Sequence, residues 1–269
     1  MPITVEHVTR YRYGSEASYS IQSLRLTPLS FEGQRVLDWG ISGTPANELT
    51  VTSDGFGNVM HLMAINAPHT TLEIRARGTV EVENRNGVVS GLDEPVPLRV
   101  FLKRTALTEP TDGIRELVRA VESGDTVARL HRLMAVVRER VDYTRGVTEA
   151  ETTAGEALAA GKGVCQDHAH IFISVARLAN IPARYVTGYL LTDGATPEAA
   201  HHAWAEAFVD GLGWVGFDVA NDICPTERYV RLACALDAHY AAPIRGARRG
   251  GETEALEVVV RVQQSNMQQ

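Results

Sequence analysis

The chain has 269 residues, with 26 Lys and Arg against 33 Asp and Glu, which gives a formal net charge of −7. Such a balance produces no broad positive field, so the composition argues against a nucleic-acid partner. The length is sufficient for two domains that each bury a core of their own.

The N-terminal segment MPITVEHVTRYRYG alternates polar and apolar residues and lacks the basic start and apolar run of a secretory signal. No stretch approaches the roughly 20 apolar residues of a membrane span, so we expect no membrane association. Three cysteines, Cys165, Cys224 and Cys234, imply no disulfide framework, although a bridge between the last two stays open. We therefore expect a cytoplasmic protein.

Residues 1–90 have the pattern of an antiparallel β region. Stretches of alternating polar and apolar residues are separated by turn formers, and these stretches are 4–13, 22–27, 58–65 and 71–83. This pattern is typical of strands folded into a β-sandwich. Residues 91–111 begin with a stretch that holds two prolines and are expected to form a linker.

From residue 112 to the end of the chain we expect a second domain, which opens with helices. Apolar residues recur at helical spacing over 114–121 and 127–137, and a short helical run begins at 155. A further helix is predicted from Cys165 to residue 179, ended by Asn180 and Pro182. Cys165 therefore lies at or next to a helix N-terminus.

The segment GKGVCQDHAH, residues 161–170, raises the question of whether Cys165 is a nucleophile. The unpaired amides and the macrodipole at a helix start favour a thiolate, and the glycines at 161 and 163 leave the sulfur uncrowded. A free cysteine is nevertheless often a small buried apolar residue. The nucleophile hypothesis therefore needs a base from elsewhere in the chain.

A candidate base lies in the segment HHAWAEAFVDGLGWVGFDVAND, which follows an expected strand at 184–191 and a loop through Asp193, Gly194 and Pro197. Two strands joined near 210–213 form a predicted hairpin. His201 and His202 begin its first strand, and Asp218 lies near the end of the second.

The loop length decides which histidine shares a face of the hairpin with Asp218. A loop of two or four residues places Asp218 on the face of His201. A loop of three residues, such as 211–213, places Asp218 opposite Glu206 and on the face of His202. Glycines at both ends of the turn favour the three-residue loop and therefore His202. They do not decide between His201 and His202.

The segments GVCQDHAH, IPARYVTGYL, HAW and WVGFD, with Asn221 three residues further on, resemble the bacterial transglutaminase-like proteins of the papain-like thiol superfamily. The resemblance implies that Cys165 is the nucleophile, His202 the general base and Asp218 the acid that orients His202. This assignment agrees with the three-residue loop.

The resemblance covers most of the chain and implies an α+β fold. It implies that residues 1–90 form the N-terminal β-sandwich of this bacterial group and that residues 112–269 form the catalytic domain. In that domain the helix that starts at Cys165 packs on an antiparallel sheet, and the stretch 254–262 is similar to a closing strand. His168 departs from the pattern, because an aromatic residue such as Phe or Tyr is expected there.

Thiol-dependent acyl transfer at a peptide or isopeptide amide follows from this resemblance, through a Cys165, His202 and Asp218 triad and a thioester intermediate. We expect hydrolysis, as in a cysteine peptidase, with a peptide or protein substrate and no cofactor. The alternatives are a protein-glutamine transamidase and a catalytically silent protein-binding module.

The remaining polar and aromatic residues have simpler interpretations. His168 and His170 lie about 200° apart on a helix and cannot face one ion, so we expect no metal site. Trp204 and Trp214 are expected in the core. The stretch 245–250, with three arginines, reads as a solvated loop and only weakly as a contact for an anionic substrate.

Overall fold

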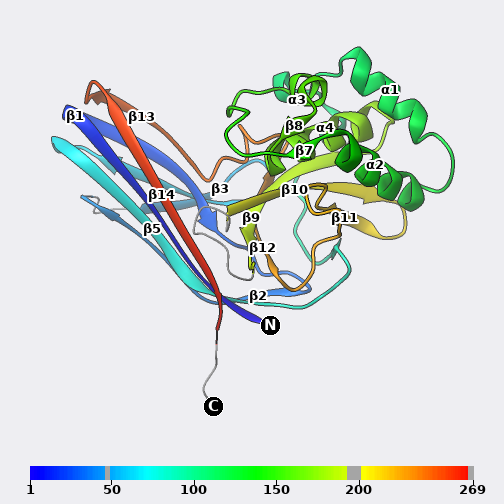
Figure 1. The fold of residues 1–269 in the computed structure, drawn as a ribbon. Coiled ribbons are helices and arrows are strands. Elements are labelled where there is room, and N and C mark those ends of the chain that lie inside the picture. Colours follow the sequence, from blue (N-terminus) through cyan, green and yellow to red (C-terminus); the bar gives the residue numbers. More distant parts are fainter. Residues whose placement is uncertain (46–48, 193–200, 266–269) are drawn as a thin grey trace.

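The structure is a computed structural model that describes residues 1–45, 49–192 and 201–265. A curled antiparallel sheet of long strands occupies one side of the molecule, and a second sheet covered by helices occupies the other (Figure 1). The expected loop through Asp193, Gly194 and Pro197 lies outside the described residues.

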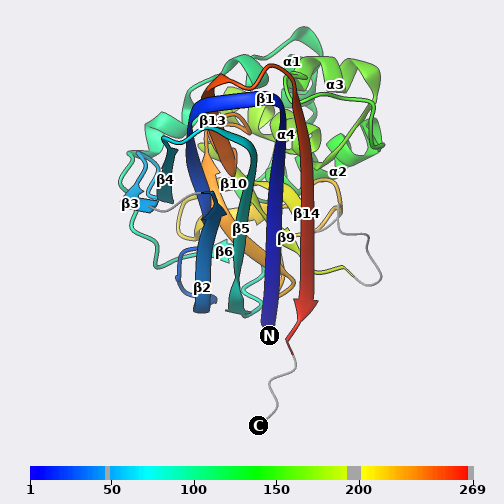
Figure 2. The same cartoon turned by 90° about the vertical axis from the view of Figure 1, so that its left-hand side faces the viewer.

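Seven of the described strands form the first sheet. They are β1 (Pro2–Thr27), β2 (Gln34–Thr44), β3 (Leu49–Ser53), β4 (Val59–Ile65), β5 (His69–Val82), β13 (Ile244–Gly250) and β14 (Glu254–Gln264). Figure 2 shows β14, β1 and β5 side by side along this sheet.

The long strand β1 holds the first sheet together, because it passes through a bend and pairs on both sides of it. Before the bend, residues 3–13 pair with β14 and residues 2–12 pair with β5. After the bend, β1 pairs with β13 and β4. The two strands expected at 4–13 and 22–27 are therefore halves of one strand. Hydrogen bonds join all seven described strands in one curled sheet, rather than in the two facing sheets of the expected sandwich.

The prediction of a solvated loop at 245–250 was wrong. This stretch is β13, whose backbone pairs antiparallel with residues 17–24 of β1. Its side chains are largely exposed, so the local composition resembles a loop while the backbone is paired with a strand far away in sequence. Pairing also crosses the expected domain division, because β13 and β14 join β1 and residues 88–89 join the second sheet.

The second sheet has the order β12 (Tyr229–Ala235), β9 (Ala183–Leu190), β10 (His201–Val209), β11 (Gly213–Phe217) and β6 (Val88–Val89). The helices are α1 (Asp112–Ala120), α2 (Thr126–Arg140), α3 (Ala154–Ala160) and α4 (Cys165–Leu178). Two short 3-10 helices, η1 (Leu98–Leu102) and η2 (Ala106–Thr108), and a two-strand ladder of β7 (Asp142–Tyr143) and β8 (Lys162–Gly163) complete the described elements. The predicted helices at 114–121, 127–137 and 165–179 are confirmed within a few residues.

Helix α4 packs on β10 and β9, which fixes the helix start relative to the sheet. Small side chains on β10, Ala203, Ala205 and Ala207, lie in the same buried cluster as α4. Within that cluster the rings of Phe172 on α4 and Phe217 on β11 stack with centroids 5.1 Å apart. The helix therefore approaches the sheet closely.

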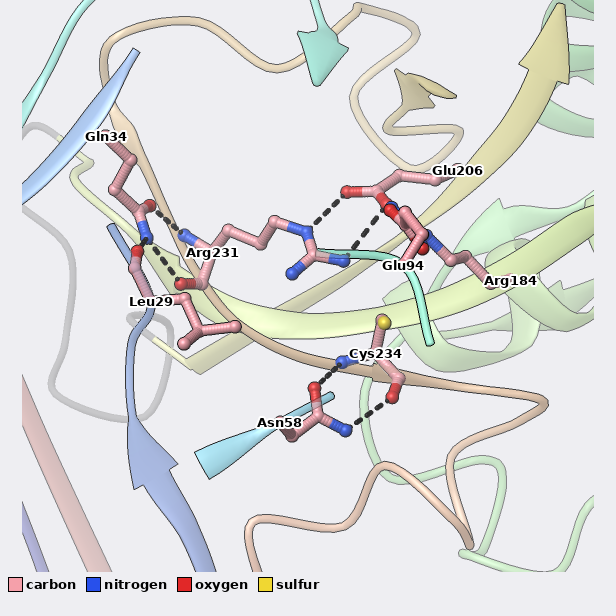
Figure 3. Close-up of polar contacts among 8 residues, drawn as sticks. All are labelled: Leu29, Gln34, Asn58, Glu94, Arg184, Glu206, Arg231 and Cys234. Carbon is pink, nitrogen blue, oxygen red and sulfur yellow. Dashed lines mark hydrogen bonds and ion pairs between the residues drawn. The ribbon is translucent and has the colours of Figure 1, made fainter. Parts of the chain in front are cut away.

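The two sheets share an apolar cluster that contains residues of β1, β4 and β5 together with Tyr189, Val230 and Leu232 of the second sheet. Two side-chain amides bond to the backbone of β12 in the manner of a neighbouring strand (Figure 3). Gln34 bonds both the N–H and the C=O of Arg231, and Asn58 does the same for Cys234. The first sheet is thus attached to β12 by polar as well as apolar contacts.

A buried ion cluster lies beside these amides (Figure 3). Glu206 on β10 pairs with Arg184 at 2.6 Å and with Arg231 at 2.8 Å, and all three side chains are at most 5% exposed. Burial alone would raise the pKa of Glu206, but the charges of Arg231 and Arg184 lower it to about 2. Arg184 also pairs with Glu94 and lies over the Trp214 ring, 3.9 Å from its centroid.

Replacing Glu206 with Gln keeps the shape of the side chain and removes the carboxylate that pairs with Arg231. We expect the free energy of unfolding to fall by about 3–5 kcal/mol, because a buried guanidinium then lacks its counter-charge. Glu32→Gln is the matched control, since Glu32 pairs with Arg85 where the side chains are 60% and 45% exposed. Denaturant unfolding should show less than about 1 kcal/mol for this control. Equal losses for the two variants would contradict a structural role for the buried cluster.

Candidate active site

The chain reaches Cys165 through a tight connection between two helices. Gly161 ends α3 in the left-handed region with φ 64°, and Gly163 pairs in the β7–β8 ladder. A Cβ at Gly163 would come within 2.7 Å of the Asp167 side chain, so this position requires glycine. Val164 is then extended, and Cys165 is the first residue of α4.

Asp167 fixes this helix start. Its Oδ2 accepts hydrogen bonds from the Val164 N–H and the Thr148 hydroxyl, each at 2.7 Å. An acidic side chain in the first turn also complements the positive end of the helix dipole. The backbone around Cys165 is therefore held from its own helix and from the preceding loop.

The structure brings Cys165, His202 and Asp218 together. Cys165 is half-buried and close enough to His202 for its charge to raise the pKa of that imidazole, and His202 Nε2 lies 2.7 Å from Asp218 Oδ2. Because Nε2 is engaged by Asp218, Nδ1 is the ring nitrogen left for the sulfur. The three side chains come from the start of α4, the start of β10 and the residue after β11.

The charges around His202 favour the protonated form of its imidazole. Burial alone would lower the pKa of His202, but the negative charges of Cys165 and Asp218 and hydrogen bonds to both raise it to about 10. Burial alone would raise the pKa of Asp218, yet hydrogen bonds from His202, Tyr229 and Asn221 outweigh burial and lower it. The site therefore holds a proton on His202 and keeps Asp218 ionised.

The hairpin has a three-residue loop, 210–212, because Val209 pairs with Gly213 and Ala205 pairs with Phe217. Asp218 follows Phe217 and so falls opposite Trp204, not opposite Glu206 as expected for a loop at 211–213. The pairing has shifted by two residues, which leaves the face unchanged. Asp218 is accordingly on the side of His202.

His201 lies on the other side of β10, away from the thiol. Its Nε2 lies 2.9 Å from the Thr187 hydroxyl, and its ring contacts those of His7 and Tyr189. Burial, and then the charge of His202, lower the pKa of His201 to about 4. His201 is thus a neutral side chain between the two sheets.

His168 and His170 have separate backbone partners. The ring nitrogens of His168 lie 2.8 Å and 2.9 Å from the carbonyls of Val164 and Val141, so this histidine fills the space behind the helix start. His170 Nε2 accepts the Ala238 N–H at 3.1 Å. In the part of the chain that the structure describes, no cluster of His, Cys, Asp and Glu is placed to hold a metal ion, and the three cysteines are free thiols.

Tyr229 is a residue of this site that the sequence pattern did not indicate. Its hydroxyl donates to Asp218 Oδ2 at 2.7 Å, and its ring meets those of His202 and Trp204 edge-on. The Asn221 side chain donates to the same carboxylate oxygen at 2.6 Å. Trp204 is 2% exposed and stacks beside His202, as expected of a core residue. Tyr229 comes from β12, beyond the reach of any short motif.

Two family descriptions match the chain. The bacterial transglutaminase-like N-terminal region matches residues 3–81, and the transglutaminase-like superfamily matches residues 115–219. An uncharacterized protein of Mycobacterium leprae is 32% identical over 272 residues, which cover 96% of this chain and 97% of that protein. An uncharacterized protein of Mycobacterium tuberculosis is 28% identical over 280 residues, which cover 90% and 86%.

Among solved structures, one from Cytophaga hutchinsonii, described as a candidate cysteine protease, is similar in fold. Its TM-score is 0.79 at 22% identity, with 100% of this chain and 92% of that chain covered. No helix in the described ranges has both the length and the apolar character needed to cross a bilayer. The family matches and the similarity along nearly the whole Mycobacterium leprae protein show that the chain belongs to the transglutaminase-like superfamily, in the bacterial group with this N-terminal region.

Proposed function

We propose that the protein catalyses thiol-dependent acyl transfer at a peptide or isopeptide amide and passes the acyl group to water. The observation that carries the proposal is the placement of Cys165 at the start of α4 beside His202, whose Nε2 lies 2.7 Å from Asp218 Oδ2. Superfamily membership and a fold shared with a candidate cysteine protease support the same chemistry.

In the first half-reaction the Cys165 sulfur attacks the carbonyl carbon of the amide. His202 holds a proton on Nδ1, and this proton passes to the leaving nitrogen as the C–N bond breaks. The product is a thioester at Cys165 and a free amine. Asp218 keeps His202 in the required orientation and stabilises its positive charge.

The helix start supplies a site for the negative oxygen that forms during attack. Cys165 is the first residue of α4, so its backbone N–H has no acceptor within the helix. This N–H, with the positive end of the helix dipole behind it, donates to the oxyanion.

In the second half-reaction water attacks the thioester. His202 takes a proton from the water, the C–S bond breaks, and a carboxylic acid leaves the regenerated thiolate. A transamidase would admit an amine at this step. Hydrolysis is our choice because no described residue pattern identifies an amine site.

The thiol should react with iodoacetamide fast below pH 7 in the native protein and far more slowly in His202→Ala, because the imidazolium stabilises the thiolate. His201→Ala is the matched control and should leave most of the rate, since His201 faces Thr187. Peptide mass spectrometry locates the adduct. Equal losses in the two variants would overturn the assignment of His202.

The pH profile of peptide-amide hydrolysis should keep its alkaline limb near pH 10, because the pKa of His202 is raised to about 10. The free imidazole titrates near 6.5. The raised pKa of His202 also affects the free energy of unfolding. Protonated His202 stabilises the folded state fully below about pH 6.5, and this stabilisation is lost as the pH rises through about 10. In Asp218→Asn the alkaline limb should move toward neutral pH. An unchanged limb in that variant would contradict the pairing of His202 with Asp218.

The group that accepts the acyl chain in the second half-reaction is identified by adding a primary amine to a hydrolysis reaction. We expect the carboxylic acid to remain the main product by mass spectrometry, because no pattern among the described residues identifies an amine site. Amide product in large excess over acid would show a transamidase and refute hydrolysis. If Cys165 forms no acyl product of either kind, the protein is a binding module.

A further inference from the structure

A cavity of about 840 Å³ lies beside the start of α4. Its wall includes Gln166, which follows Cys165, and His201, which precedes His202. Tyr185 and Thr187 of β9 also line it, and burial, followed by the charge of Cys165, raises the pKa of the Tyr185 hydroxyl. The cavity therefore reaches the start of α4 through Gln166, although Cys165, His202 and Asp218 are not among the residues that line it.

The cavity continues toward the first sheet. A second hollow of about 410 Å³ shares His201, Pro243 and Ile244 with it and is otherwise lined by residues of β1 and β14. Two apolar side chains in this second hollow, Leu256 and Val258, are 57% and 42% exposed. Together the two hollows form a groove with charged side chains in the larger cavity and apolar side chains over the first sheet.

The larger cavity has more positive than negative side chains, whereas the whole chain has a net negative charge. Lys103, Arg104 and Arg245 line it, against two carboxylates, Glu151 and Asp237. Asp237 is 2% exposed and accepts the Tyr240 N–H, so it serves the fold. Among the residues that the structure describes, neither Lys103 nor Arg245 forms an ion pair, while Arg104 lies 3.8 Å from Glu109.

A protein of net charge −7 thus exposes two cations without a carboxylate partner in this cavity. Because like charges elsewhere on the molecule repel an acidic chain, a local positive cavity favours the binding of such a chain there. The apolar end of the groove requires a substrate long enough to reach Leu256.

We propose that the groove binds an extended peptide with acidic side chains in the larger cavity and apolar side chains further along. The acidic groups contact Lys103 and Arg245, and the apolar groups lie over Leu256 and Val258. The inference rests on the proposed function, because it names the substrate of that site.

Binding to the Cys165→Ala protein tests the inference without turnover. Two dye-labelled peptides are compared by fluorescence anisotropy, identical except that glutamate in one is glutamine in the other, and both end in valine and leucine. We expect the glutamate peptide to bind about fivefold more tightly at low salt, with a smaller difference at high salt. Equal affinities, or a preference for glutamine, would overturn the inference.

Charge reversal assigns the preference to the cavity. In the same background, Lys103→Glu and Arg245→Glu should each abolish the preference for glutamate. Arg249→Glu changes the net charge equally from an exposed position on the same strand as Arg245, outside the cavity, and should retain it. The same loss in all three variants would show a general charge effect and refute the assignment.

The apolar end is tested with Leu256→Ser, which should weaken the full peptide about fivefold and leave a peptide lacking valine and leucine unaffected. Val51→Ser is the control, since Val51 is 64% exposed on β3, outside the groove. Equal effects on the two peptides would remove Leu256 from the proposed groove. Cleavage of the same peptides by the native protein is measured in a separate experiment. Glutamate preference without cleavage would retain this groove and refute the proposed hydrolysis.

Discussion

The buried contact between His202 and Asp218 is the constraint on which the rest of the site depends. A fully buried carboxylate is costly unless hydrogen bonds satisfy it, and here His202, Tyr229 and Asn221 all donate to it. These donors come from β10, from β12 and from the turn after β11. The Asp218 carboxylate therefore joins three parts of the second sheet at the point where it also helps to raise the pKa of His202.

The first sheet supports this arrangement from the opposite side of β10. His7 on β1 lies 3.0 Å from the Tyr189 hydroxyl, and its ring packs against His201, the neighbour of His202. Gln34 and Asn58 attach the same sheet to β12, which carries Tyr229. The N-terminal region thus contacts both strands that position the catalytic group, and in our proposal it also extends the substrate groove.

Sequence patterns predict the local features of this protein well, since they depend on few residues. The helix start at Cys165 follows from glycines and apolar spacing, and the side of Asp218 follows from whether the hairpin loop is odd or even. The bend of β1, the pairing of β13 and the hydroxyl of Tyr229 depend on contacts between residues far apart in the chain. Those contacts leave no short periodic signal, so the solvated loop was predicted incorrectly and the expected sandwich is not confirmed.

The most direct test of the central claim is mass spectrometry of the protein after brief mixing with an activated peptide ester. The account predicts an acyl group on Cys165 that disappears as free acid forms, and no such intermediate in His202→Ala. The half-buried thiol of Cys224 is an internal control in the same sample. Acylation of Cys224 in preference to Cys165, or a stable Cys165 adduct that water does not release, would contradict the account.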